Sequence, residues 1–297
     1  MSVQDESKKT TEKKITNLVL SGGGVKGIIM LGALQALNNN GILENINAIS
    51  RTSVGSLIGV AYAMGYTIDE LYEFLSILDM SKMKSLHPSR LFSQFGLDDG
   101  KRFMLVIEKM LEAKNFSPDV TLLEFYEKTG FKLYITGTCL NDKKIYYFSH
   151  KSHPNMKIVL AIRISISVPL WFVPVEYEGN MYVDGGCMEN YPMSIFKDEL
   201  DSTIGIYLAS EKPEIKTINN LETFLVNLLK CFEEGSELKA ICGYEKNTIK
   251  LNPANMSSFN LHISNDFKQE MFDFGYQTAI KSGLIISTIV SEPNIIY

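Results

Sequence analysis

Near the N-terminus, the spacing of hydrophobic positions alternates between two patterns. Residues 15–20 form a mostly apolar run with β-branched side chains, which predicts a strand. Residues 26–39 carry apolar side chains at helical spacing, which predicts a helix, at Ile29, Ala33, Leu34 and Leu37. The same succession returns at residues 46–50 and 56–64. Strands that alternate with helices predict an α/β fold with a mostly parallel sheet and helices on its faces.

The rest of the chain continues this alternation. Further helices are predicted at residues 67–78, 101–113, 122–128, 156–166, 221–241 and 266–281, and further strands at 131–139, 144–148, 175–177, 181–183, 202–208 and 248–251. Residues 81–100 contain a proline and two glycines and are predicted as a loop. We therefore expect a disordered polar tail at residues 1–14, a catalytic α/β domain at 15–210 and a helical extension at 211–297 packed on the same domain.

The charge balance and the cysteines narrow the class of protein. The 297 residues include 29 Lys and Arg against 34 Asp and Glu, a formal net charge of −5. A nucleic-acid-binding protein carries a basic excess that this chain lacks, so no nucleic-acid partner is expected. The cysteines form no C-x-x-C pair, which argues against a disulfide framework and indicates a reducing compartment: Cys139, Cys187, Cys231 and Cys242.

Membrane contact is expected to be local and transient. The polar first residues lack the apolar core of a signal peptide, and no apolar run reaches the ~18 residues of a transmembrane helix. A cytoplasmic protein that is at most peripheral to membranes is therefore expected. Its contacts would come from local apolar side chains, from a partner protein of unknown identity, or from a basic cluster such as Lys82, Lys84 and Arg90.

A glycine-rich turn follows the first predicted strand and opens the first predicted helix, a position suited to binding an anion through backbone N–H groups: Gly22, Gly23, Gly24, Val25, Lys26 and Gly27. Walker spacing is absent, so a phosphate loop is excluded. The turn formally fits a dinucleotide fingerprint, with Glu44 downstream, but Glu44 precedes the second strand instead of ending it. An oxyanion hole and a ligand-free turn remain as the other interpretations.

Ser53 lies between the second strand and the second helix, two residues before Gly55, which is the setting of a nucleophile elbow. The usual G-x-S-x-G pattern has a glycine where this chain has Arg51, and a helix N-cap is the alternative role of such a serine. A nucleophilic serine needs a base. The candidates are Asp184, which closes an apolar strand before two glycines, and His262, which falls on the polar side of an alternating run.

These motifs together resemble the patatin-like phospholipase family. The resemblance rests on residues 17–27, Ser53 in its elbow, residues 163–175, Gly179, the Asp184-Gly-Gly triplet, residues 190–192 and, more loosely, residues 275–276. The resemblance covers residues 15–208 and extends more weakly to residue 281. The family's fold is a three-layer sandwich, with a mostly parallel central sheet between helices.

The resemblance also implies roles for single residues. Ser53 would be the nucleophile and Asp184 the base of a Ser–Asp dyad, with Gly185 and Gly186 forming the acid loop. The glycine-rich turn would supply oxyanion N–H groups, Gly23 and Gly24 most directly, while Lys26 matches the family's basic position. The implied activity is calcium-independent hydrolysis of acyl esters of glycerolipids, with no metal or cofactor.

Two features complicate this interpretation. Arg51 departs from the family's glycine, so either it points outward, where it meets a phospholipid phosphate, or it weakens catalysis and leaves a protein that only binds lipid. The stretch 80–100 is rich in large apolar side chains: Met80, Met83, Leu86, Leu91, Phe92, Phe95 and Leu97. A lid or a bilayer-touching surface is one interpretation of this stretch, and ordinary core packing is the favoured one.

Overall fold

The structure is a computed structural model that describes residues 14–77, 85–209, 217–219, 223–224, 227–228, 231, 240–253 and 264–285. Within these residues, strands and helices alternate much as the sequence predicts. The strands are β1 (Asn17–Leu20), β2 (Ala48–Arg51), β3 (Gly96–Asp98), β4 (Lys132–Cys139), β5 (Lys144–Phe148), β6 (Leu170–Phe172), β7 (Val175–Tyr177), β8 (Asn180–Asp184), β9 (Thr203–Leu208) and β10 (Thr248–Leu251). The α-helices are α1 (Gly27–Asn39), α2 (Val54–Ala63), α3 (Ile68–Ile77), α5 (Pro88–Gln94), α6 (Lys101–Ala113), α7 (Leu122–Thr129), α8 (Ile158–Ser165) and α10 (Asn265–Lys281).

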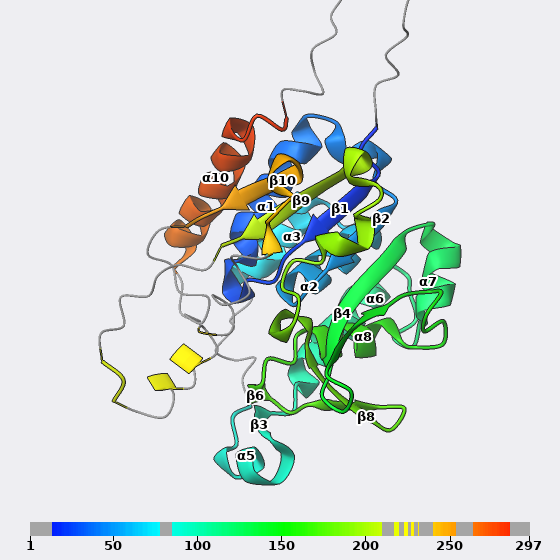
Figure 1. Ribbon diagram of the computed structural model, residues 1–297, viewed down its shortest axis with the longest axis vertical. Coiled ribbons are helices and arrows are strands. Elements are labelled where there is room, and N and C mark those ends of the chain that lie inside the picture. The colour runs from blue at the N-terminus through cyan, green and yellow to red at the C-terminus, as the bar shows by residue number, and fades with distance from the viewer. Residues whose placement is uncertain are drawn as a thin grey trace, which may run out of the picture.

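A mixed sheet forms the centre of the structure (Figure 1). Its strand order is β10-β9-β1-β2-β4-β8-β7, and β5 pairs with β4 beside this path. The strands from β10 to β4 run parallel, whereas β5 and β8 run antiparallel to β4, and β7 antiparallel to β8. The α/β class and the mostly parallel sheet are therefore confirmed.

Successive side chains of the central strands enter different hydrophobic clusters, as a strand requires. Leu18, Leu20 and Ile49 belong to the larger cluster, which also holds the buried side chains of α1, α2 and α8. Val19 and Ala48 belong to a second cluster, together with the buried side chains that follow β8. The sheet is thus buried on both faces, which explains the continuous apolar runs of its strands.

The C-terminal part of the chain joins the same body through β10, which pairs with β9, and α10, which packs on α1. A Cβ atom added at Gly32 would lie 1.9 Å from the carbonyl oxygen of Phe272, and one at Gly275 would lie 1.9 Å from that of Ile29. The two helices therefore touch through their backbones. The domain boundary at residue 210 stays a prediction, because residues 210–216 lie outside the described residues.

Residues 85–100 are not the predicted loop, because α5 and β3 lie within them. Pro88 occupies the first turn of α5, where its missing N–H is harmless. β3 is paired in parallel with β6, a long-range contact that local spacing does not reveal. Residues 1–13 of the predicted tail (1–14) and most of the predicted helix at 221–241 lie outside the described residues. Within the described part of the chain, no helix has the length and apolar character needed to span a membrane.

Candidate active site

Ser53 occupies a strained turn between β2 and α2. Its backbone angles are φ 52° and ψ −126°, a conformation that a side chain other than glycine rarely adopts. Ser53 stands at the N-cap position of α2, but its side chain makes no capping hydrogen bond, so the hydroxyl is not used to cap the helix. A strained strand-to-helix turn of this kind projects a serine hydroxyl away from the sheet, as a nucleophile elbow does.

Buried contacts hold this elbow in place. The Ser53 N–H donates to Ser165 Oγ at 3.1 Å, and Ser165 Oγ also shares a hydrogen bond of 2.8 Å with Ser56 Oγ. A Cβ atom at Gly55 would lie 2.6 Å from the carbonyl oxygen of Ser21. The first turn of α2 therefore packs directly against the end of β1, which only glycine permits at position 55.

Arg51 lies beneath α2 and is fully buried. A Cβ atom at Gly59 would lie 2.8 Å from Arg51 Cδ, so this glycine of α2 makes room for the side chain. Arg51 Nη1 donates to the Ile49 carbonyl at 3.3 Å, while Nε and Nη2 have no hydrogen-bond partner in the described part of the chain. Burial lowers the pKa of Arg51 to about 9. The expectation that Arg51 points outward to a phospholipid phosphate is wrong, because no part of it reaches the surface.

The glycine-rich turn winds into a short 3₁₀ helix (Gly24–Lys26) ahead of α1. The Lys26 N–H donates to the Gly23 carbonyl at 3.2 Å, and the Gly27 N–H donates to the Gly24 carbonyl. The Lys26 side chain is buried. Lys26 and Gly27 therefore shape the turn, and their N–H groups are already used within it.

The remaining N–H groups of the turn divide into two kinds. The Gly22 N–H donates to the Asn190 carbonyl at 3.0 Å, so the expectation that it is an oxyanion donor is wrong. The N–H groups of Gly23 and Gly24 have no acceptor among the described residues, and Gly24 is exposed. Its φ of 55° suits glycine. These two groups are the ones that can donate to a bound oxyanion.

Asp184 ends β8 and is 4% exposed. Its Oδ1 accepts the Gly186 N–H at 2.7 Å, and its own N–H donates to the Ser167 carbonyl at 2.9 Å. A Cβ atom at Gly185 would lie 2.1 Å from Thr136 Oγ1, so this glycine lets the acid loop lie against β4. The carboxylate is thereby fixed in direction and largely removed from water.

β4 lies between the strands that lead to Ser53 and Asp184. Arg51, two residues before Ser53, is paired with Ile135 in the parallel β2–β4 ladder. Asp184 is paired with Gly137 in the antiparallel β4–β8 ladder. The end of β2 and the end of β8 therefore approach each other from the two sides of β4.

The side-chain amide of Asn190 lies between the two halves of the site. A Cβ atom at Gly22 would lie 2.2 Å from Asn190 Oδ1 and 3.1 Å from Ser53 Cβ. A Cβ atom at Gly186 would lie 3.2 Å from both Asn190 Oδ1 and Asp184 Oδ1. The nucleophile side and the acid side thus contact the same amide.

Asn190 is held in turn through its neighbour Glu189. The Glu189 side chain accepts hydrogen bonds from the hydroxyls of Tyr147 and Ser194, and its carbonyl accepts one of 3.0 Å from Thr52 Oγ1. Burial and the Glu189 carboxylate raise the pKa of Tyr147, so the phenol stays protonated and keeps donating. The segment that carries Asn190 is therefore fastened to the elbow itself.

The family model for patatin-like phospholipases matches residues 18–197, a range that includes the glycine turn, Ser53, Asp184 and Asn190. This chain belongs to the patatin-like phospholipase family. The uncharacterized protein R571 of Acanthamoeba polyphaga mimivirus is 35% identical over 285 residues, which are 91% of this chain and 94% of that protein. The probable lipid hydrolase 463L of Invertebrate iridescent virus 6 is 32% identical over 191 residues, which are 62% of this chain and 63% of 463L, less than two thirds of its length.

A solved structure shows the same fold. VipD from Legionella pneumophila matches 93% of this chain and 67% of its own with a TM-score of 0.63, at 16% sequence identity. At that identity the likeness establishes the patatin-like fold alone.

The sequence reasoning missed the residues that position this patatin-like site. The blocks that carry the family resemblance include Asn190, Ser165 and Ser167. The sequence therefore marks these positions, but it does not show what each side chain contacts. Thr136 lies in the middle of an apolar strand and gave no signal. The contacts of these residues join strands that are far apart in the chain, and spacing along the sequence does not report such contacts.

Two other sequence interpretations concern residues away from the site. Glu44 is exposed in a 3₁₀ helix (Ile42–Asn45) before β2, a place unlike that of the acid in a dinucleotide site. His262, the alternative base, lies outside the described residues. In the described ranges, no group of three or more His, Cys, Asp or Glu side chains is arranged to hold a metal ion.

Proposed function

We propose that this patatin-like protein is a lipid acyl hydrolase, of the phospholipase A or lysophospholipase type, that cleaves carboxylic esters of glycerolipids. Ser53 is the nucleophile, Asp184 is the general base, and the N–H groups of Gly23 and Gly24 form the oxyanion hole. The observation that carries the proposal is the strained backbone of Ser53, together with a Ser53 hydroxyl that makes no capping hydrogen bond to α2. Strain of this kind persists where the surrounding structure enforces it, and it clusters at active sites.

The reaction follows from these positions. The Ser53 hydroxyl attacks the ester carbonyl carbon while Asp184 accepts the hydroxyl proton. Negative charge develops on the carbonyl oxygen, where each glycine N–H donor is worth about 2.7–4 kcal/mol. The alcohol leaves with the proton from Asp184, and an acyl-Ser53 intermediate remains. Water then attacks this acyl group while Asp184 accepts a proton from it. Asp184 returns that proton to the leaving Ser53 oxygen, and the fatty acid is released.

The weakened, lipid-binding alternative depends on Arg51 distorting the elbow. The buried position of Arg51 beside Gly59 argues against that distortion, because the side chain fills space under α2 and Ser53 keeps its elbow angles. Turnover is therefore favoured over binding alone. We further propose that hydrolysis needs no calcium, since the base and the charge stabilisation both come from the chain, and that the substrate is reached through transient membrane contact.

Acyl release tests this function. The full-length protein is incubated with phosphatidylcholine, lysophosphatidylcholine and a short-chain soluble ester, with and without a calcium chelator. We expect Ser53→Ala and Asp184→Asn each to lower kcat/KM by at least ~10³-fold, because both act in one catalytic unit. Ser117→Ala, at an exposed serine, is the matched control and should keep the wild-type rate.

A fluorophosphonate probe gives an independent measurement, because it labels only an activated serine. Labelling is expected at Ser53 in the wild type and in Ser117→Ala, and its loss is expected in Ser53→Ala. Undiminished hydrolysis by Ser53→Ala contradicts the assigned nucleophile. A wild type that neither hydrolyses the panel nor reacts with the probe favours the lipid-binding alternative.

A further inference from the structure

Residues 85–100 project from the body of the protein as a lobe made of α5 and β3 (Figure 1). It carries three large apolar side chains in water: Phe92 is 86% exposed, Phe95 is 58% exposed and Leu86 is 42% exposed. α5 has no buried residue. Single exposed apolar residues are ordinary on a protein surface, but a cluster on one projecting element marks an interaction site.

We propose that this lobe is the bilayer-docking surface of the protein and that Phe92, Phe95 and Leu86 insert among phospholipid head groups. The proposal rests on the proposed function, because a lipid hydrolase of membrane glycerolipids needs such a contact. Aromatic and leucine side chains are the ones that interfacial proteins bury at the head-group level of a bilayer.

The charges of the lobe fit a phospholipid surface. The protein has a net charge of −5, yet residues 86–95 contain no carboxylate. Arg90 is the one formally charged side chain of that stretch, and it is joined by Lys101 and Arg102 immediately beyond the lobe. A stretch free of carboxylates avoids repulsion from lipid phosphates.

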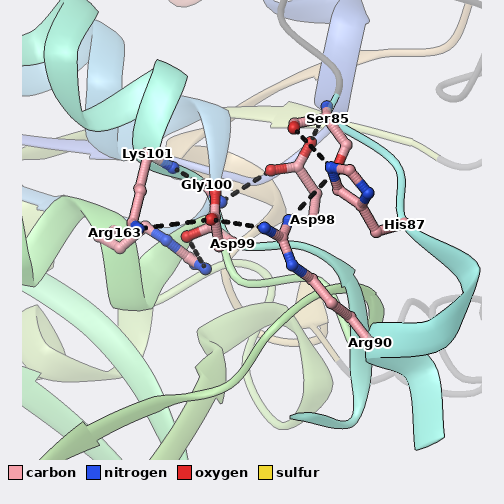
Figure 2. Close-up of polar contacts among 8 residues, drawn as sticks. All are labelled: Ser85, His87, Arg90, Asp98, Asp99, Gly100, Lys101 and Arg163. Atoms are coloured by element: carbon pink, nitrogen blue, oxygen red, sulfur yellow. Dashed lines mark hydrogen bonds and ion pairs between the residues drawn. The ribbon is translucent and has the colours of Figure 1, made fainter. Parts of the chain in front are cut away.

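The two carboxylates of the lobe are held by hydrogen bonds and ion pairs (Figure 2). Asp98 is buried, where it accepts the N–H groups of Gly100 and Ser85. Asp99 forms ion pairs with Arg90 at 3.2 Å and with Lys101 at 3.7 Å. Both carboxylates are therefore paired within the chain, and contact of the lobe with lipid would bring no unpaired carboxylate to the bilayer.

The base of the lobe is fixed to the segment that also holds the candidate base. β3 pairs with β6, and the buried Arg163 donates to the carbonyls of Asp99 at 3.2 Å and Val173 at 2.8 Å. Ser167 in the same segment accepts the N–H of Asp184 through its carbonyl. Docking through this lobe would therefore set the orientation of the site relative to the bilayer.

The test measures binding of the full-length protein to sedimented vesicles of diether phosphatidylcholine with a fifth of diether phosphatidylglycerol, lipids that it cannot hydrolyse. The double variant Phe92→Ser/Phe95→Asn removes both rings, and asparagine suits the φ of 64° at position 95. Its vesicle partition coefficient is expected to fall at least ~10-fold, since burying one phenylalanine is worth about that factor.

A matched pair of leucines controls for general loss of surface hydrophobicity. Leu86→Ser alters the lobe, whereas Leu140→Ser alters a leucine that is 46% exposed in the turn between β4 and β5. Weaker vesicle binding is expected for Leu86→Ser and unchanged binding for Leu140→Ser. Equal losses in the two variants, wild-type binding by the double variant, or absence of vesicle binding by the wild type would each overturn the proposal.

Two further measurements distinguish bilayer docking from self-association and from a failure of the proposed activity. If the wild type is a dimer that the double variant dissociates while vesicle binding stays unchanged, the lobe is a contact between two copies and the bilayer proposal is wrong. Hydrolysis of the soluble short-chain ester should be equal in the wild type and the lobe variants. Absence of that activity in the wild type, with lobe-dependent vesicle binding retained, contradicts the proposed function and leaves the docking surface standing.

Discussion

Replacing Arg51 with methionine is expected to stabilise this protein. The Arg51 guanidinium is fully buried and makes one hydrogen bond, to the Ile49 carbonyl, while its other two nitrogens have no partner in the described ranges. Methionine has a similar length and flexibility and can fill the space beside Gly59 without a charge. The Arg51→Met change therefore removes a desolvated charge and keeps most of the packing.

The size of the effect follows from the pKa of Arg51. Burial lowers it from 12.5 to about 9. One pKa unit corresponds to about 1.4 kcal/mol, so holding the charged form in this place costs the folded state on the order of 5 kcal/mol at neutral pH. Replacement of buried ions by packed hydrophobic side chains has stabilised other proteins by about 1–4 kcal/mol. We expect a gain in that range, and a rise in Tm of at least about 2 °C.

The pH dependence has a definite sign. Because the pKa of Arg51 is lower in the folded state than in the unfolded state, the cost is full below pH ~9 and shrinks as the pH rises from there toward 12.5. The advantage of Arg51→Met over the wild type should therefore be largest at pH 7. At pH 10 it should be smaller by about 1.4 kcal/mol.

Thermal unfolding followed by circular dichroism measures this difference, and Arg163→Met is the matched control. Arg163 is also buried, but it donates to the carbonyls of Asp99 and Val173 and to Ser167 Oγ. Its removal leaves two half-buried carbonyls and the buried Ser167 hydroxyl without this donor, so Arg163→Met should lower Tm. If Arg51→Met lowers Tm to the same degree, the Arg51 guanidinium has a partner and the reasoning fails.

Two glycine substitutions should separate catalysis from stability. Gly22→Ala is expected to lower kcat by at least ~100-fold with Tm changed by less than about 3 °C. The reason is that its Cβ would lie 2.2 Å from Asn190 Oδ1 and displace Asn190 from the elbow. A fully active variant contradicts the assigned role of the Asn190 contact. Gly275→Ala is expected to lower Tm by roughly 4 °C or more with activity per folded molecule retained, because its Cβ would lie 1.9 Å from the Ile29 carbonyl; unchanged thermal unfolding would contradict the close packing of α1 on α10.

Local patterns are sufficient to predict most of this fold. The apolar runs and turns predict β5 and β7 at their observed bounds and place α10 within one residue of its start. Ser53 and Asp184 can be named as candidates because Gly55 follows Ser53, two glycines follow Asp184, and the ordered motifs resemble the patatin-like family. Such signals are local, since a tight turn after a strand needs particular residues at particular positions.

Properties that depend on contacts between distant segments escape prediction. β3 exists because β6, far along the chain, pairs with it. The sequence favours core packing for the apolar side chains of residues 80–100, but Phe92, Phe95 and Leu86 are exposed, and residues 78–84 lie outside the described residues. An amphipathic pattern does not say whether a partner element arrives to cover it.

The Arg51 side chain does not crowd the elbow, because neighbouring side chains of a strand point to opposite faces of the sheet. In β2, Ile49 and Arg51 share one face and enter the layer of α2, whereas Ser50 faces the opposite side and donates to the Pro192 carbonyl. The direction of Ser53 is set by its own backbone angles and by Ser165, after the strand has ended. A large side chain at position 51 is therefore directed under α2, away from the tight turn. The family's glycine at this position keeps a side chain from crowding the elbow. In this chain Gly59, one helical turn after Gly55 in α2, instead leaves the space that the Arg51 side chain fills.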